Sequence, residues 1–498
     1  MDYLVMLLWI LIAWACIHVL FLARKRASCN SKLPPGPIPL PIVGNLFKLG
    51  DKPNESLTEL AKTYGPLMTL RLGCKTTIIV SSANMAKEIL QKNDQACTAR
   101  NAVDALHALN FNDSSIVWSQ PTERWRKLRK ISTTQMFSAA RLEASKDLRI
   151  KIVQDLLAQL HEHRRTEQPV VIREVIFVTI VNLLSNTIFS VNLVDPNSKS
   201  AQDFKDIVTG VMKESGRLNL VDYFPMLRAI DPQGIRRRMM DHLGKLFEVF
   251  DRMIDERMLS RSMSSDHPRR NDFLDVLLDE TEQNGLEIGR DDIKGVLGDM
   301  FIAGTDPSAA TIEWALAELL RNPDSMAKAR AELRETIGSR QVKDSDIASL
   351  PYIKAVVKET LRLHPPAPFF FRDTIADVEI DRFTIPKNTT VKINVWSIGR
   401  DPKMWANPSD FWPERFLESD IDFKGQDFEL IPFGSGRRIC PGLPLAFRTL
   451  HVMLASLLHS FSWKLPDGMT PKDIDMSDKV SMTLELANPL RVVPMLDG

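Results

Sequence analysis

The sequence is poor in cysteine and lacks the spacing that cysteine-bound metals use. Its 498 residues include five cysteines, with no C-x-x-C pair among them. An odd, scattered set argues against a disulfide framework and favours a reducing compartment. It also argues against structural zinc, which takes four clustered ligands. The five are Cys16, Cys29, Cys74, Cys97 and Cys440.

The chain also lacks an excess of charge of either sign. The formal net charge is +1, so no overall field would draw the protein to nucleic acid, and we expect no nucleic-acid partner. Hydrophobic residues make up 44% and charged residues 26% of the sequence, as in ordinary globular proteins. The length allows one large domain or two or three smaller ones.

One segment carries no formal charge at all. From Tyr3 to Ala23 the residues are mostly apolar with one histidine, and the run is long enough to span a bilayer. Arg24 to Arg26 follow it without a signal-peptide cleavage site, which favours an anchor. Because basic flanks stay in the cytosol, we expect residues 1–23 to form a single transmembrane helix with the body on the cytosolic side. The alternative is a buried core helix.

Residues 24–45 are predicted to be a basic flank and a proline-rich strap. From Leu33 to Asn45, repeated prolines fix the backbone and remove amide donors, so this part should be stiff and extended. It would hold the body, residues 46–498, at a set distance from the membrane.

The body is predicted to be mainly α-helical with small β-sheets. Strand patterns occur from Leu67 to Ser82 and over 378–398, whereas helical patterns dominate from Met85 to His364 and again over 443–461. The polar segment from Ser260 to Asp272 is expected to be a mobile surface loop.

A cysteine near the C-terminus stands in an unusual context. In "FELIPFGSGRRICPG", Cys440 follows Arg437 and Arg438 and precedes Pro441, which suits the first turn of the next helix. The helix N-terminus and the arginines should lower the pKa of the thiol and favour thiolate. One thiolate without a second ligand nearby suits a metal held by a macrocycle, that is, haem with an axial cysteine.

This stretch resembles the cysteine-ligand signature of the cytochrome P450 superfamily, Phe-x-x-Gly-x-Arg-x-Cys-x-Gly. Phe433, Gly436, Arg438, Cys440 and Gly442 stand at its fixed positions. The resemblance implies the cytochrome P450 fold and haem b, whose iron is bound by the thiolate of Cys440. It also implies that Phe433, Gly436 and Arg438 contact the cofactor.

Further P450 motifs occur in the order typical of the family. The Glu-x-x-Arg pair is Glu359 and Arg362, and Arg415 in "FWPERF" matches the arginine that locks the pair. The resemblance implies a buried structural network without a chemical role. In "WRKLR", Trp125 and Arg129 are expected to meet a haem propionate.

The segment "FFFRD" departs from the family pattern. Relatives usually have Pro-Arg there, but this chain lacks the proline. Arg372 is a further candidate for binding a propionate. Phe369 to Phe371 are expected either to wall the substrate pocket or to pack in the core.

The stretches "YGPLMTLRLG" and "VVKETLRLHPPAP" resemble plant microsomal P450s of the geraniol 8-hydroxylase-like branch. The resemblance implies a monooxygenase in the endoplasmic reticulum membrane that acts with O2 on an apolar specialised metabolite, such as a monoterpenol or a diterpene. Electrons would come from NADPH through NADPH–cytochrome P450 reductase. A basic cluster is either a docking face for that reductase or solvated surface; its members are Arg126, Lys127, Lys130 and Arg437.

A proline interrupts the expected oxygen-handling helix. In "IAGTDPSAATIEW", the residues fit the family pattern Ala/Gly-Gly-x-Asp/Glu-Thr-Thr/Ser except that Pro307 replaces the first threonine. In the family, that hydroxyl helps deliver protons during oxygen activation, and proline cannot donate one. Because relatives open this helix beside the haem, the proline should cost little backbone energy there. The catalytic candidates are Thr305, Asp306, Pro307 and Ser308.

The proline leaves three interpretations open. Ser308, Asp306 or water could take over in an ordinary monooxygenase. The hydroxyl group of the substrate could supply the hydrogen bond. The enzyme could instead catalyse oxidative coupling, rearrangement or another atypical oxidation of a phenolic or alkaloid substrate. A hypothesis from another class is a haem protein without catalysis, which the nearly complete oxygen-helix motif and the anchor disfavour.

Overall fold

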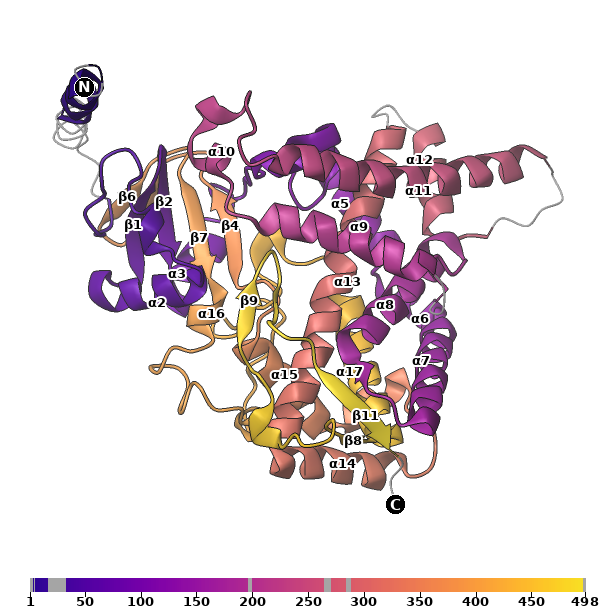
Figure 1. Ribbon diagram of the computed structural model, residues 1–498. Coiled ribbons are helices and arrows are strands. Elements are labelled where there is room, and N and C mark those ends of the chain that lie inside the picture. Colours follow the sequence, from indigo (N-terminus) through magenta and orange to yellow (C-terminus); the bar gives the residue numbers. More distant parts are fainter. Residues whose placement is uncertain are drawn as a thin grey trace.

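The structure is a computed structural model that describes residues 3, 5–16, 33–195, 199–263, 270–283 and 288–495. Helices form most of it (Figure 1). The α-helices of the body are α2 (Pro53–Tyr64), α3 (Ala83–Lys87), α4 (Phe111–Ser114), α5 (Glu123–Gln135), α6 (Ala139–Ala144), α7 (Lys146–Thr166), α8 (Ile172–Phe189), α9 (Lys199–Gly216), α10 (Leu220–Tyr223), α11 (Ile235–Met263), α12 (Phe273–Gln283), α13 (Arg290–Arg321), α14 (Pro323–Ile337), α15 (Pro351–Leu363), α16 (Val395–Ile398) and α17 (Leu443–Ser460). Short helical turns are η1 (Leu46–Lys48), η2 (Glu88–Lys92), η3 (Asp104–Asn110), η4 (Pro225–Leu227), η5 (Asp344–Ser349), η6 (Pro413–Phe416), η7 (Gly436–Arg438) and η8 (Pro471–Asp473).

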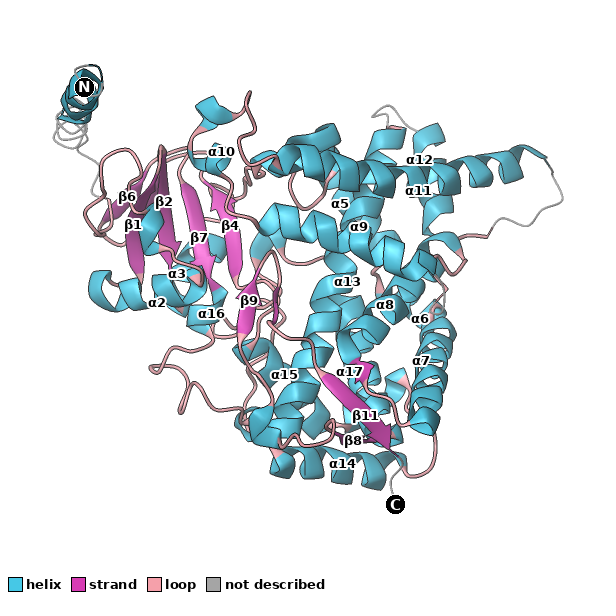
Figure 2. Ribbon diagram, in the orientation of Figure 1, coloured by secondary structure: helices cyan, strands magenta, loops and turns pink. Residues whose placement is uncertain are grey.

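Small sheets lie beside the helices (Figure 2). The largest has the order β1-β2-β7-β4, in which β2 and β7 are parallel and the other pairs antiparallel. The prediction of a mainly helical body with small sheets is confirmed. The strands are β1 (Leu67–Leu72), β2 (Lys75–Val80), β3 (Val170–Val171), β4 (Phe369–Asp373), β5 (Val378–Ile380), β6 (Phe383–Ile385), β7 (Thr390–Asn394), β8 (Ser462–Lys464), β9 (Asp478–Val480), β10 (Leu484–Leu486) and β11 (Arg491–Met495).

Helix α13 runs through the middle of the body. Its side chains are buried on nearly every side, whereas a surface helix buries one apolar stripe. It packs against α8, α15 and α17. Among the described residues, α8 is the one helix long and apolar enough to cross a membrane, but 72% of it is buried inside the protein, so it is a core helix.

The predicted anchor is described only in part. Val5–Cys16 forms an apolar helix that is too short, as described, to cross a bilayer, and its side chains are exposed. The end of the predicted span and the basic residues Arg24 to Arg26 lie outside the described residues. A transmembrane helix over residues 1–23 therefore stays a prediction.

The proline-rich strap is attached to the sheet and is not free-standing. The amide and the hydroxyl of Thr69 on β1 donate to the carbonyls of Pro35 and Pro34, at 2.9 and 2.7 Å. A Cβ atom on Gly36 would lie 1.9 Å from the Thr69 oxygen, so only glycine permits this close approach. The strap thereby covers the open edge of β1.

Two local predictions need correction. Helix α11 continues to Met263, inside the segment predicted to be a loop, and residues 264–269 of that segment lie outside the described residues. The segment Val395–Ile398 is helical instead of extended, because the Asn394 side chain accepts a hydrogen bond from the Ser397 amide and caps the turn.

Glu359, Arg362 and Arg415 meet in one buried network between α15 and η6. Arg362 donates to both oxygens of Glu359, at 2.6 and 2.8 Å, and Arg415 donates to one of them at 3.0 Å. Arg362 also donates to the carbonyls of Gly399 and Pro408, at 2.6 and 2.7 Å. The network therefore fixes α15 to residues 399–415, which form little regular secondary structure.

We predict that Glu359→Gln lowers the free energy of unfolding by about 3–5 kcal/mol, because it leaves buried guanidinium groups without a counter-charge. Urea unfolding of the purified protein measures the loss. Glu335→Gln is the matched control, since Glu335 lies exposed on α14 and its replacement should change stability by less than about 0.5 kcal/mol. Equal urea midpoints for the two variants would contradict the prediction.

Candidate functional site

A cavity of about 860 Å³ lies between α13, β4 and the loop that precedes α17. Ala303, Gly304, Pro307 and Ser308 of α13 line it, and so does Cys440. The cavity therefore joins the helix that contains the proline to the loop that contains the cysteine. Apolar side chains form much of the remaining wall, among them Leu106, Phe111, Ile180, Leu184, Ile302 and Met482.

The loop that carries Cys440 is held by its own backbone. The Cys440 amide donates to the Phe433 carbonyl at 2.9 Å, and Gly434 and Gly436 adopt positive φ angles of 75° and 69°, which favour glycine. Phe433 and Gly434 line the cavity. Gly436 was predicted to contact the cofactor, but it packs elsewhere: a Cβ atom there would lie 2.3 Å from the Leu90 carbonyl oxygen.

The pKa of Cys440 differs from the sequence-based expectation. Burial raises the pKa of the thiol, although backbone amides and the Arg129 guanidinium oppose the rise. The expected lowering is therefore wrong for the thiol by itself, because burial outweighs these favourable contacts and the side chains of both neighbouring arginines bond elsewhere. Arg437 pairs with Asp94 at 3.3 Å, and Arg438 donates to backbone carbonyls. A coordinating metal would deprotonate the thiol outright.

Four arginines surround the same cavity. Arg100, Arg129, Arg372 and Arg438 all line it, and in the part of the chain that the structure describes none of them forms an ion pair with a carboxylate. Burial and mutual repulsion lower the pKa of Arg100 to about 10 and that of Arg438 to about 9. Such a cluster is costly by itself and favours the binding of an anionic group.

Trp125 packs against two arginines of this cluster. Its indole N–H donates to the Ile116 carbonyl at 2.9 Å, and its ring lies 4.3 Å from Cζ of Arg438 and 5.7 Å from Cζ of Arg129. Trp125 is not part of the cavity lining. It positions two guanidinium groups, and its direct contact with a propionate stays a prediction.

Two of the predicted catalytic residues face away from the cavity. The Thr305 hydroxyl donates to the Phe301 carbonyl at 2.7 Å, and the Asp306 carboxylate pairs with Arg173 at 2.5 Å. Both side chains are buried, and neither lines the cavity. Asp306 therefore belongs to an ion-pair cluster on the other side of α13, where Arg173 also pairs with Glu485.

Pro307 and Ser308 lie in the wall itself. The predicted opening of the helix at this point is wrong, because α13 continues through Pro307. Proline has no amide hydrogen to donate to the carbonyl of Ala303, and Ala303 is exposed to the cavity. The Ser308 hydroxyl donates to the Gly304 carbonyl at 3.3 Å, a long hydrogen bond that a stronger acceptor could displace.

Comparisons with known proteins identify the family. The family model for cytochrome P450 matches residues 34–490. Geraniol 8-hydroxylase from Swertia mussotii is 50% identical over 95% of this chain and 94% of its own length, and geraniol 8-hydroxylase from Catharanthus roseus is 47% identical over 99% of each. A solved structure of a zebra fish cytochrome P450 with progesterone shares the fold with a TM-score of 0.77 at 24% identity, covering 89% of this chain and 99% of its own.

The chain belongs to the cytochrome P450 family. It is a P450 monooxygenase, and the P450 fold predicted from its motifs is confirmed. Its relatives at 45–50% identity include the geraniol 8-hydroxylases, so the predicted resemblance to that branch is confirmed as well.

The family implies haem whose iron is bound by a cysteine thiolate, and the cavity of this P450 fits that group. The Cys440 side chain lies in the lining and supplies a thiol. The two carboxylates of haem would offset part of the positive charge of the arginine cluster. The Nε atom of Arg372 is buried without a hydrogen-bond partner, which is the kind of donor that such a carboxylate would satisfy.

Sequence reasoning missed several residues of the P450 cavity. Arg100 lies in "CTARN", where no motif marks it, and only the fold brings it beside Arg372. Asp299 and Thr311 could have been found, since they lie on the same helix as Pro307 at helical spacing. Asp299 accepts hydrogen bonds from the Ser115 hydroxyl and the Ile116 amide, at 2.7 and 2.5 Å, and so fixes a loop of the cavity wall.

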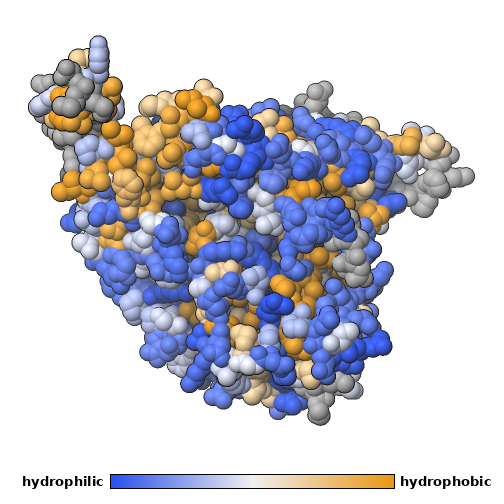
Figure 3. Space-filling model, viewed as in Figure 1, coloured by the Kyte–Doolittle hydropathy of each residue, from blue (hydrophilic) through white to orange (hydrophobic). Residues whose placement is uncertain are grey.

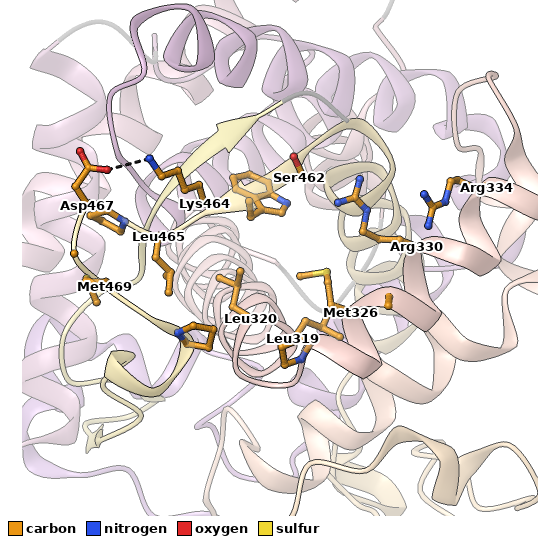
Figure 4. A pocket seen from close by; sticks show the side chains of 16 residues that line it. Leu319, Leu320, Met326, Arg330, Arg334, Ser462, Lys464, Leu465, Asp467 and Met469 are labelled. Atoms are coloured by element: carbon orange, nitrogen blue, oxygen red, sulfur yellow. Dashed lines mark hydrogen bonds and ion pairs between the residues drawn. The ribbon is translucent and has the colours of Figure 1, made fainter. Parts of the chain in front are cut away.

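A second hollow of about 630 Å³ lies on another part of the P450 surface, between α14 and the loop after β8 (Figure 4). Arg330 and Arg334 stand at one side of it, and Lys464 pairs with Asp467 at 3.0 Å on the other. Its lining contains no cysteine and no histidine. We therefore place the chemistry of this P450 in the cavity at Cys440.

We predict opposite effects of Arg372→Met on the haem-free and the haem-loaded protein. Without haem, removal of a buried unpaired charge beside Arg100 and Arg438 should raise the free energy of unfolding by about 1 kcal/mol or more. Haem retention should fall, since a partner for its carboxylates is lost. Urea unfolding and the ratio of haem to protein measure the two effects.

Arg437→Met provides the control for this prediction. Arg437 is the neighbouring arginine that pairs with Asp94 outside the cavity, so its replacement should leave haem retention as in the wild type. Equal haem retention by the Arg372 and Arg437 variants would show that the cluster does not bind the cofactor.

Proposed function

We propose that this P450 is a membrane-anchored haem-thiolate enzyme that hydroxylates a terpenoid, such as a monoterpenol or a diterpene. The observation that carries the proposal is one mostly apolar cavity that joins Cys440 to a cluster of unpaired arginines. Such a lining suits a hydrocarbon skeleton. Two relatives that cover nearly the whole chain are named for the hydroxylation of geraniol, which supports a terpenoid substrate.

Haem bound at Cys440 would supply the activation of O2, and the residues of the chain would hold and orient the reactants. Arg100, Arg129, Arg372 and Arg438 would bind the carboxylates of haem. The Phe433 ring and the Gly434 backbone line the cavity beside Cys440 and would exclude water from the thiolate. Apolar side chains from α8 and α13 would orient the substrate.

Ser308 is the residue that we propose for proton delivery. Of the hydroxyl and carboxyl groups predicted for this task, the Ser308 side chain is the one that lines the cavity. Its long hydrogen bond to Gly304 leaves it free to turn and donate. The alternative function, oxidative coupling or rearrangement, keeps support from Pro307, which lines the cavity where relatives have a threonine.

An apolar surface supports attachment to the membrane. Ile38, Phe47, Met226 and Ile230 are 82%, 78%, 74% and 70% exposed, and we call them the lipid-facing patch. The hairpin formed by β1 and β2 touches the segment around α10, because the Cys74 amide donates to the Tyr223 carbonyl at 3.0 Å. Figure 3 shows hydrophobic residues gathered on this side of the body, beside the N-terminal helix. We propose that residues 1–23 cross the endoplasmic reticulum membrane and that the lipid-facing patch rests on its cytosolic surface.

NADPH–cytochrome P450 reductase is the proposed electron donor. Arg126 and Lys130 are exposed on α5, and Arg129 of the same helix donates to the Ile439 carbonyl next to Cys440. A negatively charged partner at these side chains would therefore lie close to the cysteine loop. Lys127 and Arg437 contribute less, because they pair with Glu280 and Asp94.

The test of the proposed function is co-expression with a plant reductase, a panel of monoterpenols, diterpenes and phenolic alkaloids, and ¹⁸O2. We expect a hydroxylated terpenoid that carries the label. Unlabelled product would favour coupling or rearrangement. Cys440→Ser should abolish the thiolate-type absorption band of the reduced carbon monoxide complex, whereas Cys74→Ser, at an exposed cysteine, should keep it.

We predict that Ser308→Ala reduces the yield of product per NADPH by about tenfold or more, as loss of a general acid does. Thr305→Ala tests the competing hydroxyl and should leave this yield close to wild type, because Thr305 bonds inside its own helix. If the yield of product per NADPH falls in the Thr305 variant and not in the Ser308 variant, the assignment of proton delivery to Ser308 is wrong. Pro307→Thr should raise the yield if the proline compromises proton delivery.

A further inference from the structure

Lys392 lies in an unusual position on the four-stranded sheet. It stands on β7 directly opposite Phe371 of β4, and its ammonium lies 3.9 Å from the ring centroid of Phe369 and 5.3 Å from that of Phe371. Because side chains alternate along a strand, these three side chains share one face of the sheet, and Arg372 lies on the other. The lysine is also part of the cavity lining.

The ammonium of Lys392 lacks a counter-charge. Among the described residues, none forms an ion pair or a hydrogen bond with it, and burial lowers its pKa to about 8, so it stays mostly charged at pH 7. Two other half-buried lysines of this chain have carboxylate partners: Lys205 pairs with Glu174 at 2.7 Å, and Lys294 pairs with Asp251 at 3.5 Å. Two aromatic rings compensate only part of the lost hydration.

The cavity around Lys392 lies toward the proposed membrane side. Its lining there includes Leu49 and Pro53 near the start of α2, and Leu218 and Tyr223 near α10. Asp51 and Asp222 line this part too; neither pairs with Lys392, and the Asp222 carboxylate accepts the Asp104 amide at 2.6 Å. The Tyr223 carbonyl binds the hairpin next to the lipid-facing patch. Lys392 and Cys440 therefore line the same cavity, with Lys392 in the part formed by β4 and β7.

We propose that Lys392 binds an acceptor oxygen of the substrate, with a carboxylate preferred over an alcohol. The substrate would then be amphipathic, with its oxygenated end at Lys392 and its apolar body extending along the cavity toward Cys440. Lys392 would thereby select which end of the molecule reaches the reactive centre. This inference rests on the proposed function for the identity of the molecule, because it assigns the polar end of that same substrate.

The affinity that Lys392 should add depends on the strength of a hydrogen bond to a charged group. A hydrogen bond to a charged group contributes about 10- to 100-fold in affinity. Lys392 should add less affinity for an alcohol than for a carboxylate, and none for a hydrocarbon of the same skeleton.

The experiment uses the full-length haem protein in its oxidised state and needs no turnover. Geranic acid, geraniol and myrcene serve as probes that share a C10 skeleton and differ in the oxygenated group. Titration of the haem absorption spectrum gives a dissociation constant for each. We expect the wild type to bind geranic acid at least about 10-fold more tightly than myrcene, and Lys392→Met to lose this preference.

Four variants make the comparison specific. Methionine keeps the length of lysine without its charge, and Lys392→Gln is a second uncharged variant should the first fail to load haem. Lys392→Arg should keep part of the preference. Lys387→Met removes the same charge from an exposed site in the turn before β7, outside the cavity, and should keep all of it.

The outcomes separate this inference from the proposed function. An unchanged preference in both uncharged variants, or no preference in the wild type, overturns the role of Lys392 whatever product the enzyme makes. A preference that depends on Lys392, together with no labelled terpenoid product in the ¹⁸O2 experiment, supports the acceptor site and overturns the proposed function.

Discussion

The stability of the structure depends on a cluster of four positive charges that the polypeptide does not neutralise. Four guanidinium groups, from α5, β4, η7 and one loop, converge on one cavity without a carboxylate partner among the described residues. Their hydration is lost and they repel one another, so the fold without a cofactor carries a cost at its centre. Haem has a shape and a charge that would offset this cost. The same site therefore determines both which cofactor fits and how much stability the cofactor adds.

The sequence was most informative where function depends on neighbours along the chain. Glu359 and Arg362 are one helical turn apart, and the loop of Cys440 is contiguous, so both could be recognised from spacing. Properties set by tertiary burial could not be predicted. Arg100 carries no local signal, Asp306 turns toward Arg173 on another helix, and the pKa of Cys440 rises because the folded chain buries the thiol. In each case the deciding partner comes from a distant segment.

Pro307 illustrates how a large core accommodates a residue that disfavours helix. The loss of one amide donor costs a few kcal/mol in an isolated helix. Helix α13 is buried along most of its length, so packing on both sides of Pro307 keeps it continuous. The effect of the proline is then chemical. It turns a carbonyl of the helix wall, that of Ala303, into an acceptor without the usual helical donor.

The placement of α13 also governs the order in which the protein can assemble. Three of its carboxylates, on Asp299, Asp306 and Glu313, bind groups that are 183, 133 and 177 residues away along the chain. Closing such long loops is slow, because their entropy is lost before the contacts form. The partner of Glu313 is the amide of Leu490, close to the C-terminus. During synthesis, the wall of the cavity can therefore be completed only after its last lining residues, Val480 to Thr483, have left the ribosome.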